Sequence, residues 1–133
     1  MLGDLVLEAK GKTTGKRVLS AEGPKVEVSF ASQGTYKGTP VKELGTFWSI
    51  PRPGGVLYGE GQGAIMTNDG EMGSWTGRGI GKIGEGGKLS YRGSVVYQTA
   101  SQGKLAPLNN AVIVFEYDVD ADDNSTERGW EWK

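Results

Sequence analysis

The sequence predicts an all-β fold: a single antiparallel β-barrel of eight or nine strands, with a β-sandwich as the alternative. Three observations predict it. Apolar and polar residues alternate with a period of two, as along residues 89–97. Turn-forming residues separate these runs at short intervals, and no long segment sustains a helical period. Glycine is unusually common, at 23 of 133 residues, and part of it forms rows on single faces of the predicted strands.

The alternating runs, taken in order, predict up to nine strands. They cover residues 3–11, 15–22, 25–37, 40–50, 55–67, 72–83, 87–100, 109–119 and 125–132. The clearest hairpin signal is the Asn-Asp-Gly sequence at 68–70, which lies between two apolar runs. Residues 102–108 have room for a short helix, which Pro107 limits. The last strand is expected to close the barrel.

Two neighbouring predicted strands carry glycine rows, which favour a barrel over a sandwich. The rows are Gly59, Gly61 and Gly63 on the first strand, and Gly77, Gly79 and Gly81 on the second. Glycine inside a strand costs about 0.5–1 kcal/mol relative to alanine, so matched rows need a geometric reason. That reason is either strong coiling of the sheet or close approach of bulky groups or a ligand to the backbone. Both suit a small closed barrel, whereas a sandwich needs larger inward side chains.

The composition excludes several classes of chemistry. The chain has no cysteine and no histidine, which excludes disulfide scaffolds, thiol catalysis, cysteine-ligated metals and catalysis by imidazole. Its 15 basic and 16 acidic residues leave a net charge of −1, which is not typical of nucleic-acid-binding proteins. We therefore expect no nucleic-acid partner. Residues 79–84 match the spacing of a dinucleotide-binding loop but lead into no helix, so no cofactor is expected.

The chain shows no pattern typical of export or of a membrane span. No basic region followed by an apolar stretch opens the sequence, and the longest apolar run covers only residues 111–115. We therefore expect a cytoplasmic protein that folds as one domain over residues 1–133.

Charged and hydroxyl residues in the glycine-rich strands are the candidates for catalysis. If the hairpin turns at residues 68–70, Glu60 lies beside Arg78 and on the same face as Tyr58. Two interpretations stay open. In the first, this face meets solvent and Glu60 and Arg78 form an ordinary surface ion pair. In the second, it lines the lumen, where Glu60 acts as a base, Arg78 anchors an anion and Tyr58 supplies a hydroxyl.

Aromatic residues on the strands are the candidates for ligand binding. If the glycine rows face inward, the lumen is apolar and its walls include Trp48, Trp75, Tyr91 and Tyr97. The alternative is that these side chains are ordinary core.

One acidic segment has the spacing of a calcium-binding loop. Asp120, Asp122, Asn124 and Glu131 occupy its first, third, fifth and twelfth positions. Ser125 stands at the sixth position, where a sharp turn requires glycine, and the flanking segments are predicted strands. A solvated acidic turn is therefore the alternative to a metal site.

The glycine-rich hairpins also resemble a known family. The matching segments are residues 57–63, 76–81 and 87–94. They resemble the central hairpins of small uncharacterised microbial proteins with an allene-oxide-cyclase-like barrel, a relative of the calycin or lipocalin architecture. The resemblance implies an eight-stranded antiparallel barrel with a central cavity. Relatives of that shape include fatty-acid-derivative cyclases, a spirocycle-forming cyclase and dirigent proteins, but no catalytic residue carries over by position.

Three functions remain open from the sequence. The first is a module that binds an apolar or amphipathic small molecule in the lumen. The second is a cyclase or isomerase acting on an apolar substrate, and the third is a structural protein with a filled barrel that associates with copies of itself. Whether the protein is an enzyme is left undecided. A lumen of about 300 Å³ or more would favour the first two functions, and a filled interior the third.

Overall fold

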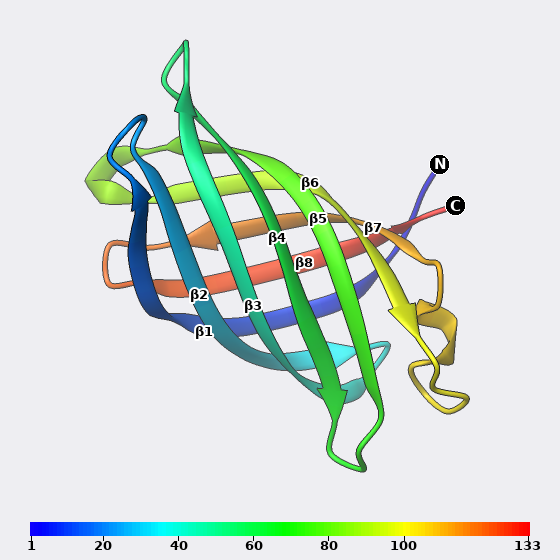
Figure 1. The fold of residues 1–133 in the computed structure, drawn as a ribbon. Helices are drawn as coiled ribbons and strands as arrows, with labels where there is room; N and C mark the ends of the chain where they lie inside the picture. Colours follow the sequence, from blue (N-terminus) through cyan, green and yellow to red (C-terminus); the bar gives the residue numbers. More distant parts are fainter.

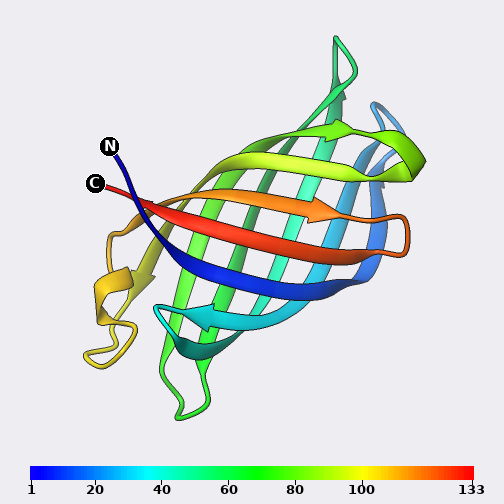
Figure 2. The same ribbon diagram turned by 180° about the vertical axis from the view of Figure 1, so that it is seen from behind.

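Eight antiparallel strands form one closed barrel in the computed structural model, which describes all residues from Met1 to Lys133. Each strand pairs with the next along the chain, and the last pairs with the first (Figures 1 and 2). The strands are β1 (Leu2–Ser20), β2 (Lys25–Tyr36), β3 (Thr39–Arg52), β4 (Val56–Thr67), β5 (Met72–Ile83), β6 (Leu89–Thr99), β7 (Val112–Val119) and β8 (Asn124–Trp132). The barrel prediction is confirmed, and the sandwich alternative is excluded.

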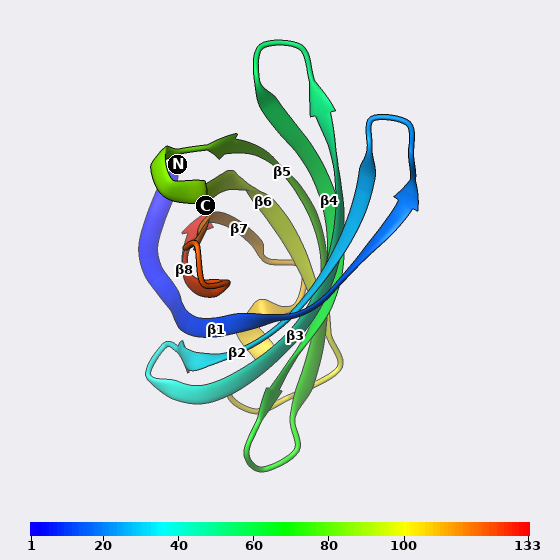
Figure 3. The same ribbon diagram turned by 90° about the vertical axis from the view of Figure 1, so that its left-hand side faces the viewer.

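The prediction of a ninth strand is wrong because the first two predicted strands form the single strand β1. The loop expected between residues 11 and 15 is a β-bulge, where the register with β2 shifts between Thr13 and Gly15. A bulge inserts an extra residue, which bends the strand and changes the face on which its later side chains lie. The bend lets β1 pair with β8 along its first part and with β2 along most of its length (Figure 3).

The barrel interior is built from one face of each strand. On β3 to β8 this face consists of the odd-numbered residues, as their burial and pairing show. The core includes Phe30, Ile65, Tyr91 and Ile113, each at most 5% exposed. The interior also holds a charged residue: Glu43, on β3, is only 2% exposed.

The glycine rows face the interior, and they are there because large side chains press against the backbone. A Cβ built on Gly63 would come within 2.4 Å of Trp75 Cζ2, and one on Gly81 within 2.6 Å of Tyr91 Cε1. Real Cβ atoms do not approach other atoms so closely, so only glycine leaves room for these rings. The rows therefore reflect the close approach of bulky groups that the sequence pattern suggested.

The β6–β7 connection covers one end of the barrel. It contains a three-residue 3-10 turn, Ala106–Leu108, in place of a longer helix. Leu105 and Leu108 are almost completely buried in the core. The Glu71 carboxylate holds this connection by accepting hydrogen bonds from Ser101 Oγ and from the backbone N–H groups of Lys104 and Leu105. No helix in the structure is long and apolar enough to cross a membrane.

Candidate functional site

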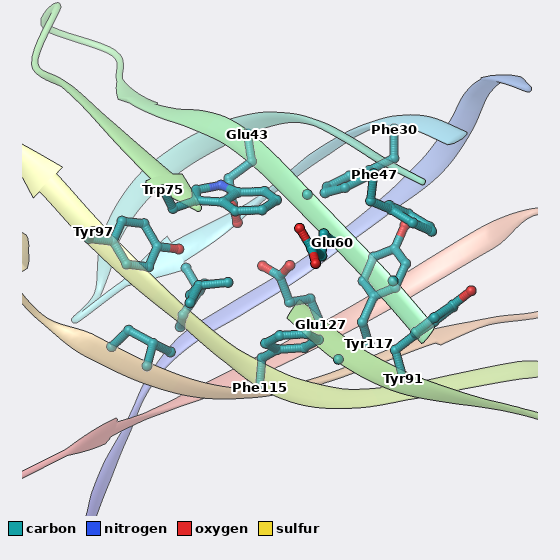
Figure 4. A pocket seen from close by; sticks show the side chains of 16 residues that line it. Phe30, Glu43, Phe47, Glu60, Trp75, Tyr91, Tyr97, Phe115, Tyr117 and Glu127 are labelled. Atoms are coloured by element: carbon teal, nitrogen blue, oxygen red, sulfur yellow. The ribbon is translucent and has the colours of Figure 1, made fainter. Parts of the chain in front are cut away.

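An interior cavity of about 70 Å³ lies in the middle of the barrel (Figure 4). Its walls are mainly aromatic: Phe30, Phe47, Trp75, Tyr91, Phe115 and Tyr117. The rings pack on one another, with centroids 5.1 Å apart for Phe30 and Tyr117 and 5.5 Å apart for Phe47 and Tyr91. The aromatic wall therefore forms one continuous surface that extends across several strands.

Two carboxyl groups lie next to each other among the aromatic side chains of the cavity wall. Glu43 extends from β3 and Glu127 from β8, and their carboxyl groups lie within hydrogen-bonding reach of each other (Figure 4). Glu127 as a residue is partly exposed, but its Oε1 atom is inaccessible to solvent, as is that of Glu43. A hydrogen bond between two carboxyl groups requires a proton, so the pair holds at least one proton.

Burial and mutual repulsion determine the protonation of the pair. Burial raises the pKa of Glu43 well above its usual value, and the negative charge of Glu127 raises it further. A side-chain hydrogen bond with Trp75 lowers the pKa of Glu43, but by less than these two effects raise it. Burial also raises the pKa of Glu127, while its hydrogen bond with Glu43 lowers it. The pKa of Glu43 is raised further than that of Glu127, so Glu43 is the last of the two to lose its proton.

Several buried polar atoms at this site form no hydrogen bond of ordinary geometry: Ser32 Oγ, Glu43 Oε1, Trp75 Nε1, Tyr117 OH and Glu127 Oε1. Their polar neighbours are side chains of the same group, Trp75 and Glu127 beside Glu43, and Ser125 beside Tyr117. An unsatisfied buried polar group costs about 1–3 kcal/mol, and more when it is charged. No lysine or arginine is among the residues that line the cavity, so no cation of the chain offsets the carboxylate there. The lumen thus combines an apolar wall with unused hydrogen-bonding capacity.

Tyrosines next to the pair are held neutral. Burial raises the pKa of Tyr97 well above its usual value, and the charges of Glu43 and Glu127 add to the effect. Burial also raises the pKa of Tyr117. Both phenols therefore offer O–H donors at neutral pH and do not contribute negative charge.

The structure divides the predicted aromatic ligand-binding residues between two faces. Trp75, Tyr91 and Tyr97 line the lumen. Trp48 lies on the outer face of β3, where the Lys25 ammonium group is 4.3 Å from the centre of its ring.

The predicted catalytic residues Tyr58, Glu60 and Arg78 lie on the outer face of β4 and β5. The predicted register is confirmed, since Glu60 pairs opposite Arg78. The two side chains form no ion pair within 4.0 Å; the Tyr58 hydroxyl donates a hydrogen bond of 2.5 Å to Glu60 Oε2 instead. Glycine occupies the inner face here, so the side chains between the glycines point outward. Glu60 still borders the cavity because only Gly59 and Gly61 separate it from the lumen.

The calcium-loop residues are not brought together. Asp120 accepts hydrogen bonds from the backbone N–H groups of Asp122 and Asn124, at 2.9 and 3.0 Å, and so closes the β7–β8 turn. Glu131 lies near the far end of β8, opposite Ile113. The structure contains no group of three acidic side chains that could hold a metal ion.

Sequence reasoning did not single out the carboxyl pair. A signal for Glu43 was present, because it alternates in phase with Val41 and Phe47 on a face expected to be buried. Glu127 shares its face with Ser125 and Gly129, whose small side chains do not indicate burial. The approach of the two carboxyl groups depends on closure of the barrel, which pairs β8 with β1 and so leaves only β1 and β2 between β8 and β3.

Comparison with known proteins shows the fold. A crystal structure of a protein with unknown function from Clostridium acetobutylicum superposes with a TM-score of 0.80 at 15% identity, covering 98% of both chains. A conserved protein of unknown function from Rhodopseudomonas palustris superposes with a TM-score of 0.79 at 15% identity, covering 99% of both chains. No protein-family model and no curated protein matches the sequence. The chain is thus similar over its whole length to uncharacterised bacterial barrels.

Proposed function

We propose that the protein binds a small amphipathic molecule in the barrel lumen, with the polar end of that molecule at Glu43 and Glu127. The observation that carries the proposal is the buried carboxyl pair, which lines an interior cavity that contains no basic side chain. A barrel with a purely structural role gains nothing from such a pair, since burying unpaired polar groups lowers stability. Groups with strongly shifted pKa values inside a pocket are typical of functional sites.

The cavity volume limits the size of the ligand. A cavity of about 150 Å³ holds benzene, whereas this cavity has a volume of about 70 Å³. It is also well below the roughly 300 Å³ expected of a binding or catalytic lumen. The proposed ligand therefore has only a few non-hydrogen atoms, and a lipid-like ligand would require the aromatic wall to move. The volume by itself favours the filled structural barrel, and the binding proposal rests on the carboxyl pair.

We also propose that the protein is related to the allene-oxide-cyclase-like barrels. Two features support it: the eight-stranded closed barrel, and the inward glycine rows beside a central cavity. In such a barrel, the ligand-binding site would lie in the lumen and not on the outer face.

Acid–base catalysis is a second candidate function, and one observation favours it. The raised pKa of Glu43 keeps a carboxylic acid protonated next to a carboxylate in an apolar pocket. Such a pair can donate a proton to one atom of a bound substrate and remove a proton from another, as an isomerase requires. A Glu43→Gln variant separates the two functions, because it can still donate a hydrogen bond to a ligand but cannot transfer a proton.

The test uses two neighbouring valines that face opposite sides of β6. Val95 lines the cavity, whereas Val96 is 51% exposed on the outer face. We expect small alcohols and amines to shift the indole N–H signal of Trp75 in NMR spectra of the wild-type protein. Val95→Leu should reduce this response at least tenfold by filling the cavity, and Val96→Leu should leave it unchanged.

Two outcomes would contradict the proposed function. One is the absence of any shift of the Trp75 signal by small polar molecules. The other is an equal response in both leucine variants, which would place binding outside the lumen. A Trp75→Phe variant assigns the signal, since the chain contains four tryptophans.

A further inference from the structure

The lumen contains acidic groups and no basic side chain to balance them. Glu43 and Glu127 lie in contact there, and once the pair retains only the proton shared between them it carries a net charge of −1. Neither lysine nor arginine lines the cavity. We infer that the ligand of the lumen is a small organic monocation, such as a short primary alkylammonium ion, whose charge balances that of the carboxyl pair. This inference rests on the proposed function, because it names the chemical class of the ligand at the same site.

The groups around the pair do not provide that balance. Tyr36 from β2, Trp75 from β5, Tyr97 from β6 and Tyr117 from β7 all lie in the core around it. The phenols stay neutral because burial raises their pKa values, and the indole is uncharged. A buried charge without a counter-charge is strongly unfavourable. A bound monocation would remove this cost, whereas an anion would increase it.

The hydrogen-bonding pattern also fits an ammonium group. Both carboxyl groups line the cavity, Glu43 from β3 and Glu127 from β8. The proton of the pair is used in the bond between the two groups, and each group has a second oxygen that is left as an acceptor. An ammonium group has three N–H donors and no acceptor, so it can satisfy both oxygens at once.

The aromatic wall favours the same chemistry. Phe30, Phe47, Trp75 and Tyr117 all line the cavity. The face of an aromatic ring is the negative end of its quadrupole and attracts cations within about 6 Å of its centre. The rest of the wall is apolar and suits a short alkyl chain. An ion with both an ammonium end and a small apolar end therefore complements both parts of the lumen.

The experiment compares probes of similar size and different charge. Ethylammonium, ethanol and acetate each have three or four non-hydrogen atoms, and potassium chloride controls for a bare cation. Alkylamines are protonated at neutral pH, as lysine is. Titrations followed by the Trp75 indole signal should show ethylammonium binding at least tenfold more tightly than ethanol, with acetate and potassium weaker still.

Isosteric variants test the role of the charge. We expect Glu127→Gln to weaken ethylammonium binding at least tenfold and to change ethanol binding less than threefold. Glu8→Gln, at an exposed position of β1 away from the cavity, should leave both affinities unchanged. Because glutamine has nearly the shape of glutamate, the variant keeps the packing of the cavity, and NMR spectra of the free protein would verify its fold.

The remaining outcomes overturn either the inference of a monocation alone or the proposed function together with it. If ethanol or acetate binds as tightly as ethylammonium, or if potassium does, the inference of an organic monocation is overturned while the proposed lumen site stands. If ethylammonium binding is unaffected by Glu127→Gln, the inference also fails. If none of the probes shifts the Trp75 signal, the proposed function fails together with the inference.

Discussion

The phenyl ring of Phe30 on β2 lies directly over the backbone of its register partner Gly45 on β3. A Cβ atom added to Gly45 would come within 2.3 Å of Phe30 Cζ and 2.4 Å of Phe30 Cε1. The ring in turn stacks on Trp75, with centroids 6.4 Å apart. This contact illustrates how the barrel accommodates large aromatic side chains: the strand position beneath the ring is a glycine, which has no Cβ atom.

We predict that Gly45→Ala lowers the stability of the barrel by about 1–3 kcal/mol, the usual cost of overpacking a core. Because the closest atoms belong to the Phe30 ring, Phe30→Leu should recover part of this loss when the two changes are combined. Gly15→Ala is the control, since its Cβ would meet nothing within 4 Å. Urea unfolding of the wild-type protein, the two single variants, the double variant and the Gly15→Ala control measures the effect, and fully additive losses in the double variant would contradict the proposed cause.

We predict that Glu43→Gln makes the protein more stable at neutral and alkaline pH. The folded-state pKa of Glu43 is raised above its usual value of 4.5. Its contribution to stability is therefore fully present below pH 4.5 and is lost as the pH rises through the folded-state value. Glutamine does not ionise, so the variant avoids this loss.

The free energy of unfolding of Glu43→Gln should equal that of the wild-type protein at pH 4. Above neutrality it should be larger by about 1–4 kcal/mol. Thermal unfolding measured between pH 4 and pH 9 gives this profile. Glu60→Gln, at the outer face, should follow the wild-type curve. A constant difference at all pH values would show that ionisation of Glu43 is not its cause.

We predict that Glu71→Gln loosens the connection that covers one end of the barrel. The carboxylate of Glu71 accepts hydrogen bonds from Ser101, Lys104 and Leu105. These bonds lower its pKa below the usual 4.5, so its contribution to stability is present above that pH and is lost as the pH falls through the folded-state value.

The variant should therefore show faster amide hydrogen exchange at residues 101–108 near pH 7, with a smaller difference from the wild-type protein in acid. Exchange at the centres of β3 and β4 serves as the internal reference. Unchanged protection of residues 101–108 would show that the buried leucines hold this connection without Glu71.

We predict that Leu108→Ala destabilises the protein by about 2–5 kcal/mol, because it removes a side chain that is only 1% exposed and leaves a cavity. Leu44→Ala changes a leucine that is 56% exposed on the outer face and should cost less than about 1 kcal/mol. Equal losses in the two variants, measured by chemical denaturation, would mean that the connection does not seal the core.

Much of the strand pattern could be predicted because it depends on neighbours along the chain. The alternation on residues 89–97 and the turn at 68–70 both correspond to the observed strands, and even the pairing of Glu60 with Arg78 followed from the position of that turn. The strand count was harder to predict, because glycine and threonine at residues 11–15 are as typical of a loop as of the bulge that keeps β1 continuous.

The candidate site could be predicted only in part. Trp75, Tyr91 and Tyr97 were identified as lumen residues on the condition that the glycine rows face inward, a choice that alternation alone left open. Trp48 alternates in the same way but belongs to the opposite face of its strand, where it contacts Lys25. A period of two separates the faces of a strand but does not say which face is buried when both carry aromatic residues.

By itself, the sequence determined that this chain forms antiparallel strands with one buried face and that it uses neither thiol nor imidazole chemistry. Those properties follow from residue types and from spacing along the chain. Only the tertiary structure decided that the glycine rows face inward and that Glu43 meets Glu127 inside the barrel. That contact joins residues 84 positions apart, and it exists because β8 pairs with β1 to close the wall.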